Sequence, residues 1–65
     1  MDPNANLAEQ LRLAQSIRTR FDGADLDTLM EIIDDAVRLA TLVQALDGWI
    51  RNGGFLPDVW KGGRG

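Results

Sequence analysis

The chain has 65 residues and a formal net charge of −3 at pH 7, and it contains neither cysteine nor histidine. Disulfides, zinc-thiolate sites, and the commonest metal ligand and general base are therefore excluded. A single domain this short buries only about 60% of the surface that its unfolded chain exposes, so close helix packing or association has to stabilise it.

The N-terminal segment, Met1-Asp2-Pro3-Asn4, is polar and acidic. It lacks the basic and apolar regions of a signal peptide, and no apolar run approaches the roughly 20 residues of a membrane span. We therefore expect a cytoplasmic protein without a membrane partner. The acidic net charge argues against nucleic acid as a partner, because sequence-independent binding rests on clustered Lys and Arg.

Residues 6–21 are predicted to form an amphipathic helix. Apolar side chains recur there every three or four residues, at Leu7, Leu11, Ala14, Ile17 and Phe21. Asn6 and Glu9 resemble a capping box at its start, although Asp2-Pro3-Asn4 also has helix-start chemistry. Three arginines, Arg12, Arg18 and Arg20, make this helix net basic.

A second, longer helix is predicted over residues 26–51, antiparallel to the first. Gly23 ends the first helix by adopting a positive φ, and Asp25 caps the second. Asn52-Gly53-Gly54 stops the second helix, and Gly48 weakens it locally. The expected fold is an all-α, antiparallel two-helix hairpin that occupies residues 1–65 as one domain.

The second helix is apolar over more than half of its circumference. A heptad-type seam of apolar residues is joined on one side by a stripe at Leu26, Met30, Ile33, Val37 and Ala40. The seam and Trp49 are the predicted homo-oligomer interface, which consists of Leu29, Ile32, Ala36, Leu39, Val43, Leu46, Trp49 and Ile50. A helix of this kind needs neighbours on several sides.

The two predicted helices differ in length, so part of the second helix has no partner in the first. At 1.5 Å per residue the first helix is about 23 Å long and the second about 39 Å, so the first reaches back only to about residue 40. Either a second copy of the chain or the C-terminal tail is expected to cover the apolar residues of the second helix that lie beyond residue 40. The tail is predicted to be extended at Pro57, with residues 61–65 disordered, and its interface side chains are Phe55, Leu56, Val59 and Trp60.

Carboxylates gather on one side of the second helix, at Asp27, Glu31, Asp34 and Asp35. They are interpreted as a solvated acidic face rather than a metal site, with i,i+4 pairs predicted for Asp34 with Arg38 and for Asp47 with Arg51. The sequence contains neither a Ser/His/Asp set nor a phosphate-binding glycine loop. We therefore expect no catalysis and no cofactor.

The segment 42–60, LVQALDGWIRNGGFLPDVW, contains Gly-Gly-Phe-Leu-Pro after a Leu-Asp-x-Trp type helix end. It resembles the C-terminal part of small uncharacterised proteins of actinobacteriophages, especially mycobacteriophages. This resemblance covers about a third of the chain and implies a phage accessory protein that acts in the host cytoplasm. It carries over no catalytic or binding residue.

Three functions are compatible with these patterns. The first is a non-enzymatic, self-associating accessory protein that acts by protein–protein interaction. The second is a host-growth inhibitor that binds a host protein through the tail 55–60. The third is a DNA-associated regulator that uses the basic first helix.

Overall fold

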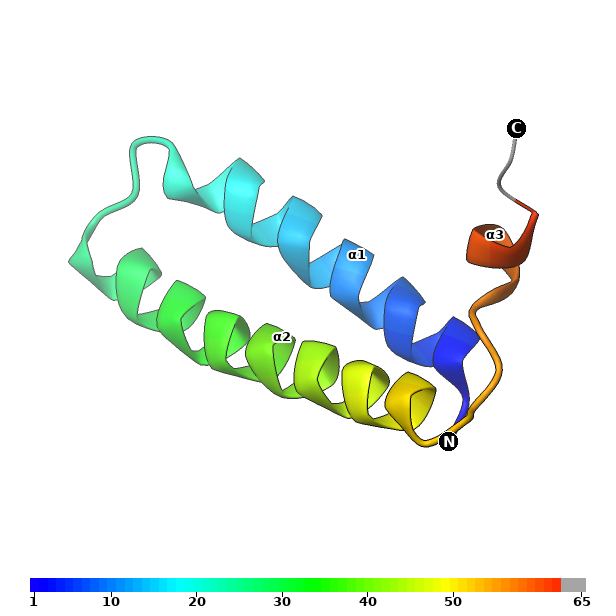
Figure 1. The fold of residues 1–65 in the computed structure, drawn as a ribbon. Helices are drawn as coiled ribbons and strands as arrows, with labels where there is room; N and C mark the ends of the chain where they lie inside the picture. Colours follow the sequence, from blue (N-terminus) through cyan, green and yellow to red (C-terminus); the bar gives the residue numbers. More distant parts are fainter. Residues whose placement is uncertain (63–65) are drawn as a thin grey trace.

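The computed structural model describes residues 1–62, and within them the chain forms helices α1 (Pro3–Phe21), α2 (Leu26–Arg51) and α3 (Asp58–Lys61). Helices α1 and α2 lie side by side and antiparallel, and α3 lies at the end of the hairpin that also holds the N-terminus (Figure 1). The predicted hairpin is confirmed, and α2 has the predicted bounds. The Cα extents of 41 × 26 × 14 Å describe a single layer of helices.

Helix α1 begins at Pro3, three residues before its predicted start. The Asp2 carboxylate caps it by accepting from the backbone N–H groups of Asn4 (2.9 Å) and Ala5 (3.2 Å), and Pro3 occupies the first turn. The helix is therefore about 28 Å long. It reaches Leu42, whose carbonyl accepts from Asn6 Nδ2, so the overhang of α2 is shorter than the predicted one.

The turn between α1 and α2 confirms its predicted chemistry. Gly23 has a φ of +73°. Asp25 caps α2 by accepting from the Thr28 N–H at 2.8 Å. This hydrogen bond holds the pKa of the Asp25 carboxyl below its ordinary value of 3.8.

The core is one row of side chains between the two long helices. Its buried apolar members are Leu7, Leu13, Ile32, Leu42 and Leu46. Asn6 is buried beside them: its Nδ2 donates to the Leu42 carbonyl at 3.0 Å, and its Oδ1 accepts from Gln10 Nε2 at 2.6 Å. Because both ends of its amide are paired, Asn6 ties α1 to α2 without an unsatisfied polar atom.

Ion pairs join the two helices along one side. Arg38 donates to both carboxylate oxygens of Glu9, from Nε and one terminal nitrogen at 3.0 Å each, and Arg20 bonds Asp35 and lies 3.8 Å from Glu31. The predicted pair of Asp34 with Arg38 is wrong, because Arg38 makes this two-pronged contact across the hairpin instead. The pair within α2 at Asp47 and Arg51 is confirmed at 2.7 Å.

Helix α2 ends in a Schellman motif. The Gly54 N–H donates to the Trp49 carbonyl (2.8 Å), the Gly53 N–H donates to that of Ile50 (3.1 Å), and Gly53 has a φ of +90°. The indole of Trp49 then packs edge-on against Phe55, with ring centroids 5.4 Å apart, and donates from Nε1 to the Phe55 carbonyl at 2.9 Å.

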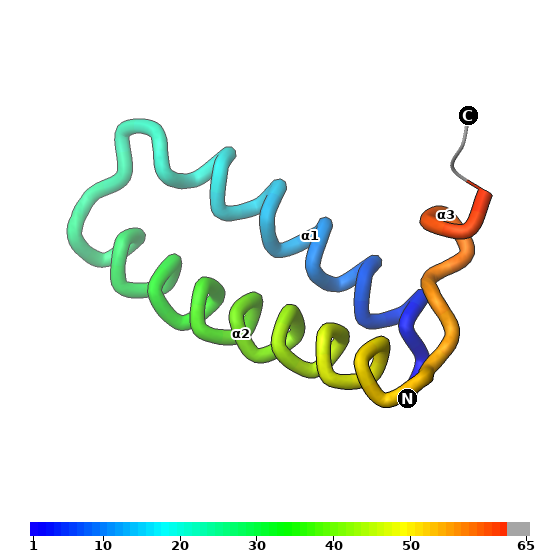
Figure 2. Tube along the Cα trace, viewed as in Figure 1, coloured from blue at the N-terminus to red at the C-terminus, as the bar shows by residue number. Residues whose placement is uncertain are grey.

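The C-terminal segment folds back across the first turn of α1, and its last part is helical rather than extended (Figure 2). Pro57 and Pro3 are both less than 2% exposed, and the Asp58 N–H donates to Asn4 Oδ1 at 2.7 Å. Asn4 thereby supplies α3 with a cap that Pro57 cannot provide. Lys61 belongs to α3, whereas residues 63–65 of the predicted disordered end lie outside the described residues.

Candidate interaction surfaces

The two faces of the helical layer differ in chemistry. One carries the ion pairs of Glu9 with Arg38 and of Arg20 with Asp35. The opposite face, which we call the open face, carries apolar side chains from both helices. Its members are Leu11, Ala14, Phe21, Leu29, Ala36, Val43 and Ile50, all at least partly exposed.

Helical periodicity places the α2 members of the open face in one row. Leu29, Ala36, Val43 and Ile50 follow one another at intervals of seven residues, which is two helical turns, so they share a side of α2. Val43 and Ile50 line a groove together with Gln10 of α1, which identifies the side of the hairpin that this row occupies.

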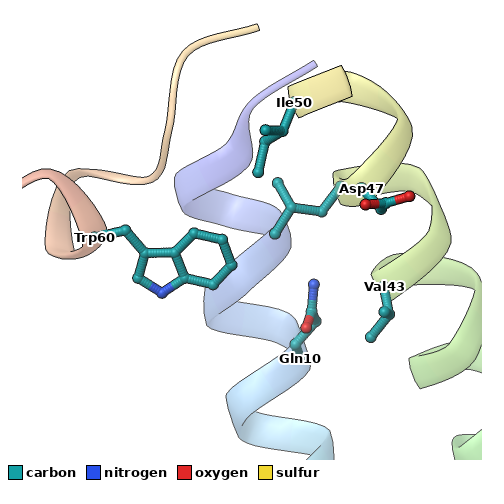
Figure 3. A pocket seen from close by; sticks show the side chains of 6 residues that line it. Gln10, Val43, Asp47, Ile50 and Trp60 are labelled. Carbon is teal, nitrogen blue, oxygen red and sulfur yellow. The ribbon is translucent and has the colours of Figure 1, made fainter. Parts of the chain in front are cut away.

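The groove is a shallow hollow of about 220 Å³ at the α3 end of the open face. It is lined by Gln10, Val43, Leu46, Asp47, Ile50 and Trp60. Trp60 comes from α3 and faces α2 across the hollow, with Val43 and Asp47 on the other side (Figure 3). Val43 is 47% exposed and Trp60 is 48% exposed, so the groove has apolar walls that the chain itself leaves partly uncovered.

The predicted oligomer interface spreads over three environments in the single chain. Ile32 and Leu46 are buried within the hairpin, and Ala36 and Val43 are exposed. The half-buried members are Leu29, Leu39, Trp49 and Ile50. The seam therefore lies along the border between the core and the open face, and Trp49 holds the tail through Phe55 rather than facing solvent.

The tail side chains predicted as an interface are all accessible: Phe55 is 53%, Leu56 38%, Val59 70% and Trp60 48% exposed. Of these four, only Trp60 lines the groove. The tail thus folds back on its own chain, while its apolar side chains cover only a small part of α2.

A second apolar surface lies on α2 away from α1, and we call it the outer stripe. It consists of Leu26, Met30, Ile33 and Val37, with exposed fractions of 72%, 61%, 59% and 62%. The buried residues Ile32 and Leu46 mark the side of α2 that faces α1, and helical rotation of 100° per residue places the outer stripe nearly opposite to them. Asp27 and Asp34, which precede and follow Met30 in the sequence, border the stripe along one edge.

Three residues with structural roles were not assigned those roles from sequence. Asn6 is predicted to cap α1, but its side chain is buried and donates to the Leu42 carbonyl of α2. Asn4 caps a helix that begins 54 residues further along the chain. Gly54 lies so close to Trp49 that an added Cβ would be 2.3 Å from the indole ring. None of these roles has a local signal, because each depends on a segment that is distant in sequence or on a side-chain position.

The basic side chains of α1 do not form one exposed cluster. Arg20 is bound to Asp35, and Arg12 lies 3.8 Å from Glu9. Among residues 1–62, no group of three or more acidic side chains has a geometry that could hold a metal ion. Over the same range, no helix has both the length and the apolar content needed to cross a membrane.

No model of a known protein family matches the chain, and neither the curated proteins nor the solved structures gave a match.

Proposed function

We propose that this protein is a non-enzymatic phage accessory protein whose working form is a dimer in the host cytoplasm, in which two hairpins pack open face to open face as a four-helix bundle. The observation that most directly supports this proposal is that the apolar row of α2 from Leu29 to Ile50 stays accessible to solvent, because the hairpin is a layer only one helix thick. A second layer on this face gives each helix the second neighbour that its apolar circumference requires.

The position of the heptad seam supports this arrangement. In a four-helix bundle each helix has two adjacent neighbours about a right angle apart, and its most buried side chains point between them. The seam contains residues that face α1, such as Ile32 and Leu46, and residues that face the open side, such as Ala36 and Val43. It is therefore oriented midway between α1 and a partner on the open face.

The charges support the same face. The ion pairs of Glu9 with Arg38 and of Arg20 with Asp35 are already formed within one chain, whereas most of the open face offers apolar groups to a partner. Burying Leu11, Phe21, Val43 and Trp60, each about half to two-thirds exposed, contributes roughly 1 kcal/mol per side chain and so about 8 kcal/mol over two copies.

Sedimentation equilibrium over a concentration series tests the proposal. The wild type is expected to approach twice the chain mass of 7.2 kDa. Ala36→Glu places a charge on the open face and should give the monomer mass. Val37→Glu is the matched control, because it adds the same side chain one position along, on the outer stripe, and should leave the dimer intact. A wild type that remains monomeric at high micromolar concentration would refute the proposal.

The tail supports a second candidate function, inhibition of a host protein. Val59 is 70% exposed beside the partly exposed Trp60, so this turn of helix offers an apolar edge to a partner. Val59→Asp should abolish capture of such a protein from a host lysate while leaving the dimer unaffected. Equal capture by the variant and the wild type would exclude this function.

A further inference from the structure

The outer stripe has an acidic border whose carboxylates form no ion pair within residues 1–62, whereas Asp47, which lines the groove of the open face, is paired with Arg51. We propose that the outer stripe is a docking surface for a cationic amphipathic helix of another protein, with apolar side chains at three- and four-residue spacing and Lys or Arg on their flank. This inference rests on the proposed role as a binding protein but does not depend on the dimer, because the outer stripe and the open face are different sides of α2.

The spacing of the apolar side chains in the stripe indicates that the partner is a helix. Leu26, Met30, Ile33 and Val37 alternate at spacings of four, three and four, and exposed Ala40 continues the pattern by three more. A facing helix with apolar residues at its own heptad positions packs against side chains at this spacing. Residues 26–40 span about 21 Å, so the complementary helix has three to four apolar turns.

The carboxylates that border the stripe indicate that the partner helix is positively charged along its flank. Asp27 lies three residues before Met30 and Asp34 four residues after it, so both carboxylates flank the same edge. Within residues 1–62 neither carboxylate is in an ion pair. The basic residue closest to Asp34 along this edge, Arg38, has its guanidinium bound to Glu9. A helix that lies on the stripe therefore meets these two unpaired carboxylates along one side.

The same border disfavours a second copy as the occupant. Two α2 helices packed antiparallel through this stripe bring their acidic edges together, and packed parallel they set carboxylates against apolar Leu29 and Ala36. Like charges in facing flank positions oppose pairing, which is how coiled coils reject wrong partners. A basic helix has neither conflict.

Fluorescence anisotropy with the full chain and designed peptides tests the proposal. The probe is a labelled 15-residue peptide with Leu at both heptad core positions and Lys at the flanking positions. The comparison peptide has Glu in place of every Lys. We expect the Lys peptide to bind about ten-fold more tightly at low salt, and this preference to shrink when Asp27→Asn and Asp34→Asn are combined, because exposed charge pairs contribute modestly and are screened by salt.

Two matched variants assign the binding to the outer stripe. Ile33→Asn combined with Val37→Asn should abolish binding of the Lys peptide and leave the sedimentation mass unchanged, whereas Ala36→Asn should leave the binding unchanged. Equal affinity for the Lys and Glu peptides, or full binding by the stripe variant, would overturn the proposal. A mass that falls only in the stripe variant would also overturn it, by showing that a second copy occupies the stripe.

Circular dichroism of each variant separates loss of binding from loss of folding. All substituted positions are exposed, so the helical signal should be retained. If dimerisation fails while the stripe binds the Lys peptide, the proposed dimer is wrong and the docking surface stands. The converse result leaves the dimer and removes the docking surface.

Discussion

Gly54 is the position where one methyl group should do the most local damage. A Cβ there would lie 2.3 Å from Trp49 Cε2, 2.4 Å from Nε1 and 2.5 Å from Cδ2. These distances are far inside van der Waals contact, so in Gly54→Ala the indole has to move. The Trp49 ring then leaves its edge-on contact with Phe55 and its Nε1–H leaves the Phe55 carbonyl.

The expected loss follows from those two interactions. The hydrogen bond contributes about 0.5–1.5 kcal/mol and the aromatic pair about the same, so Gly54→Ala should lower the free energy of unfolding by roughly 1–3 kcal/mol. In a domain of this size each kcal/mol corresponds to a fall in Tm of about 4–8 °C. Thermal melting followed by far-UV circular dichroism measures the shift.

Two other glycines serve as matched controls for the same substitution. Gly48 lies within α2 with no atom near an added Cβ, so Gly48→Ala should stabilise the protein by up to about 1 kcal/mol. Gly53 also has open space but a φ of +90°, so Gly53→Ala should cost about 1–2 kcal/mol through backbone strain alone. Only Gly54→Ala should change the indole N–H resonance of Trp49 by abolishing its hydrogen bond. A Gly54→Ala protein that melts like Gly48→Ala, with that resonance unchanged, would refute the reasoning.

Three further predictions concern the contacts between helices. Asn6→Ala should reduce the free energy of unfolding by about 1–3 kcal/mol in urea titrations, because it removes the hydrogen bond between the helices and leaves a cavity in the core; a change below 0.5 kcal/mol would contradict this. Asn4→Ala should release α3 while α1 and α2 stay folded, seen as faster proteolysis at Lys61 in the variant than in the wild type. The hydrogen bonds from Arg38 hold the pKa of Glu9 below its ordinary value of 4.5, so the stability from this pair should be present above pH 4.5 and be lost as the pH falls through the folded pKa. Equilibrium unfolding between pH 3 and 6 should show that loss in the wild type and a smaller one in Glu9→Gln.

Much of the fold is local and could be predicted. The bounds of α2 follow from Asp25 at its start and the glycine pair after Asn52, because caps act through neighbouring backbone groups. The start of α1 was missed because two cap signals lie within four residues of each other. The choice of Asp2 over Asn6 depends on the Leu42 carbonyl, which draws Asn6 into the core from 36 residues away.

The parts that sequence reasoning missed are those decided by contacts across the hairpin. Arg38 has an acidic residue four positions before it, yet it binds Glu9 on the other helix, where two hydrogen bonds are available in place of one. Pro57 predicts an extended tail, yet proline is also common at the start of a helix. The helical outcome depends on Asn4, near the other end of the chain, whose side-chain oxygen accepts from the Asp58 N–H. The apolar seam was identified from spacing, but spacing alone does not say which members face α1.

The hydrogen bond between Asn4 and Asp58 joins residues 54 positions apart, so it closes the chain almost end to end. The hairpin needs only the short turn at Gly23 to form, whereas this closure has to wait until both long helices are in place, because long loops are entropically costly to close. The ends of the chain should therefore be the last part to fold and the first to open. In the native state, α3 would detach from the first turn of α1 while the hairpin stays closed.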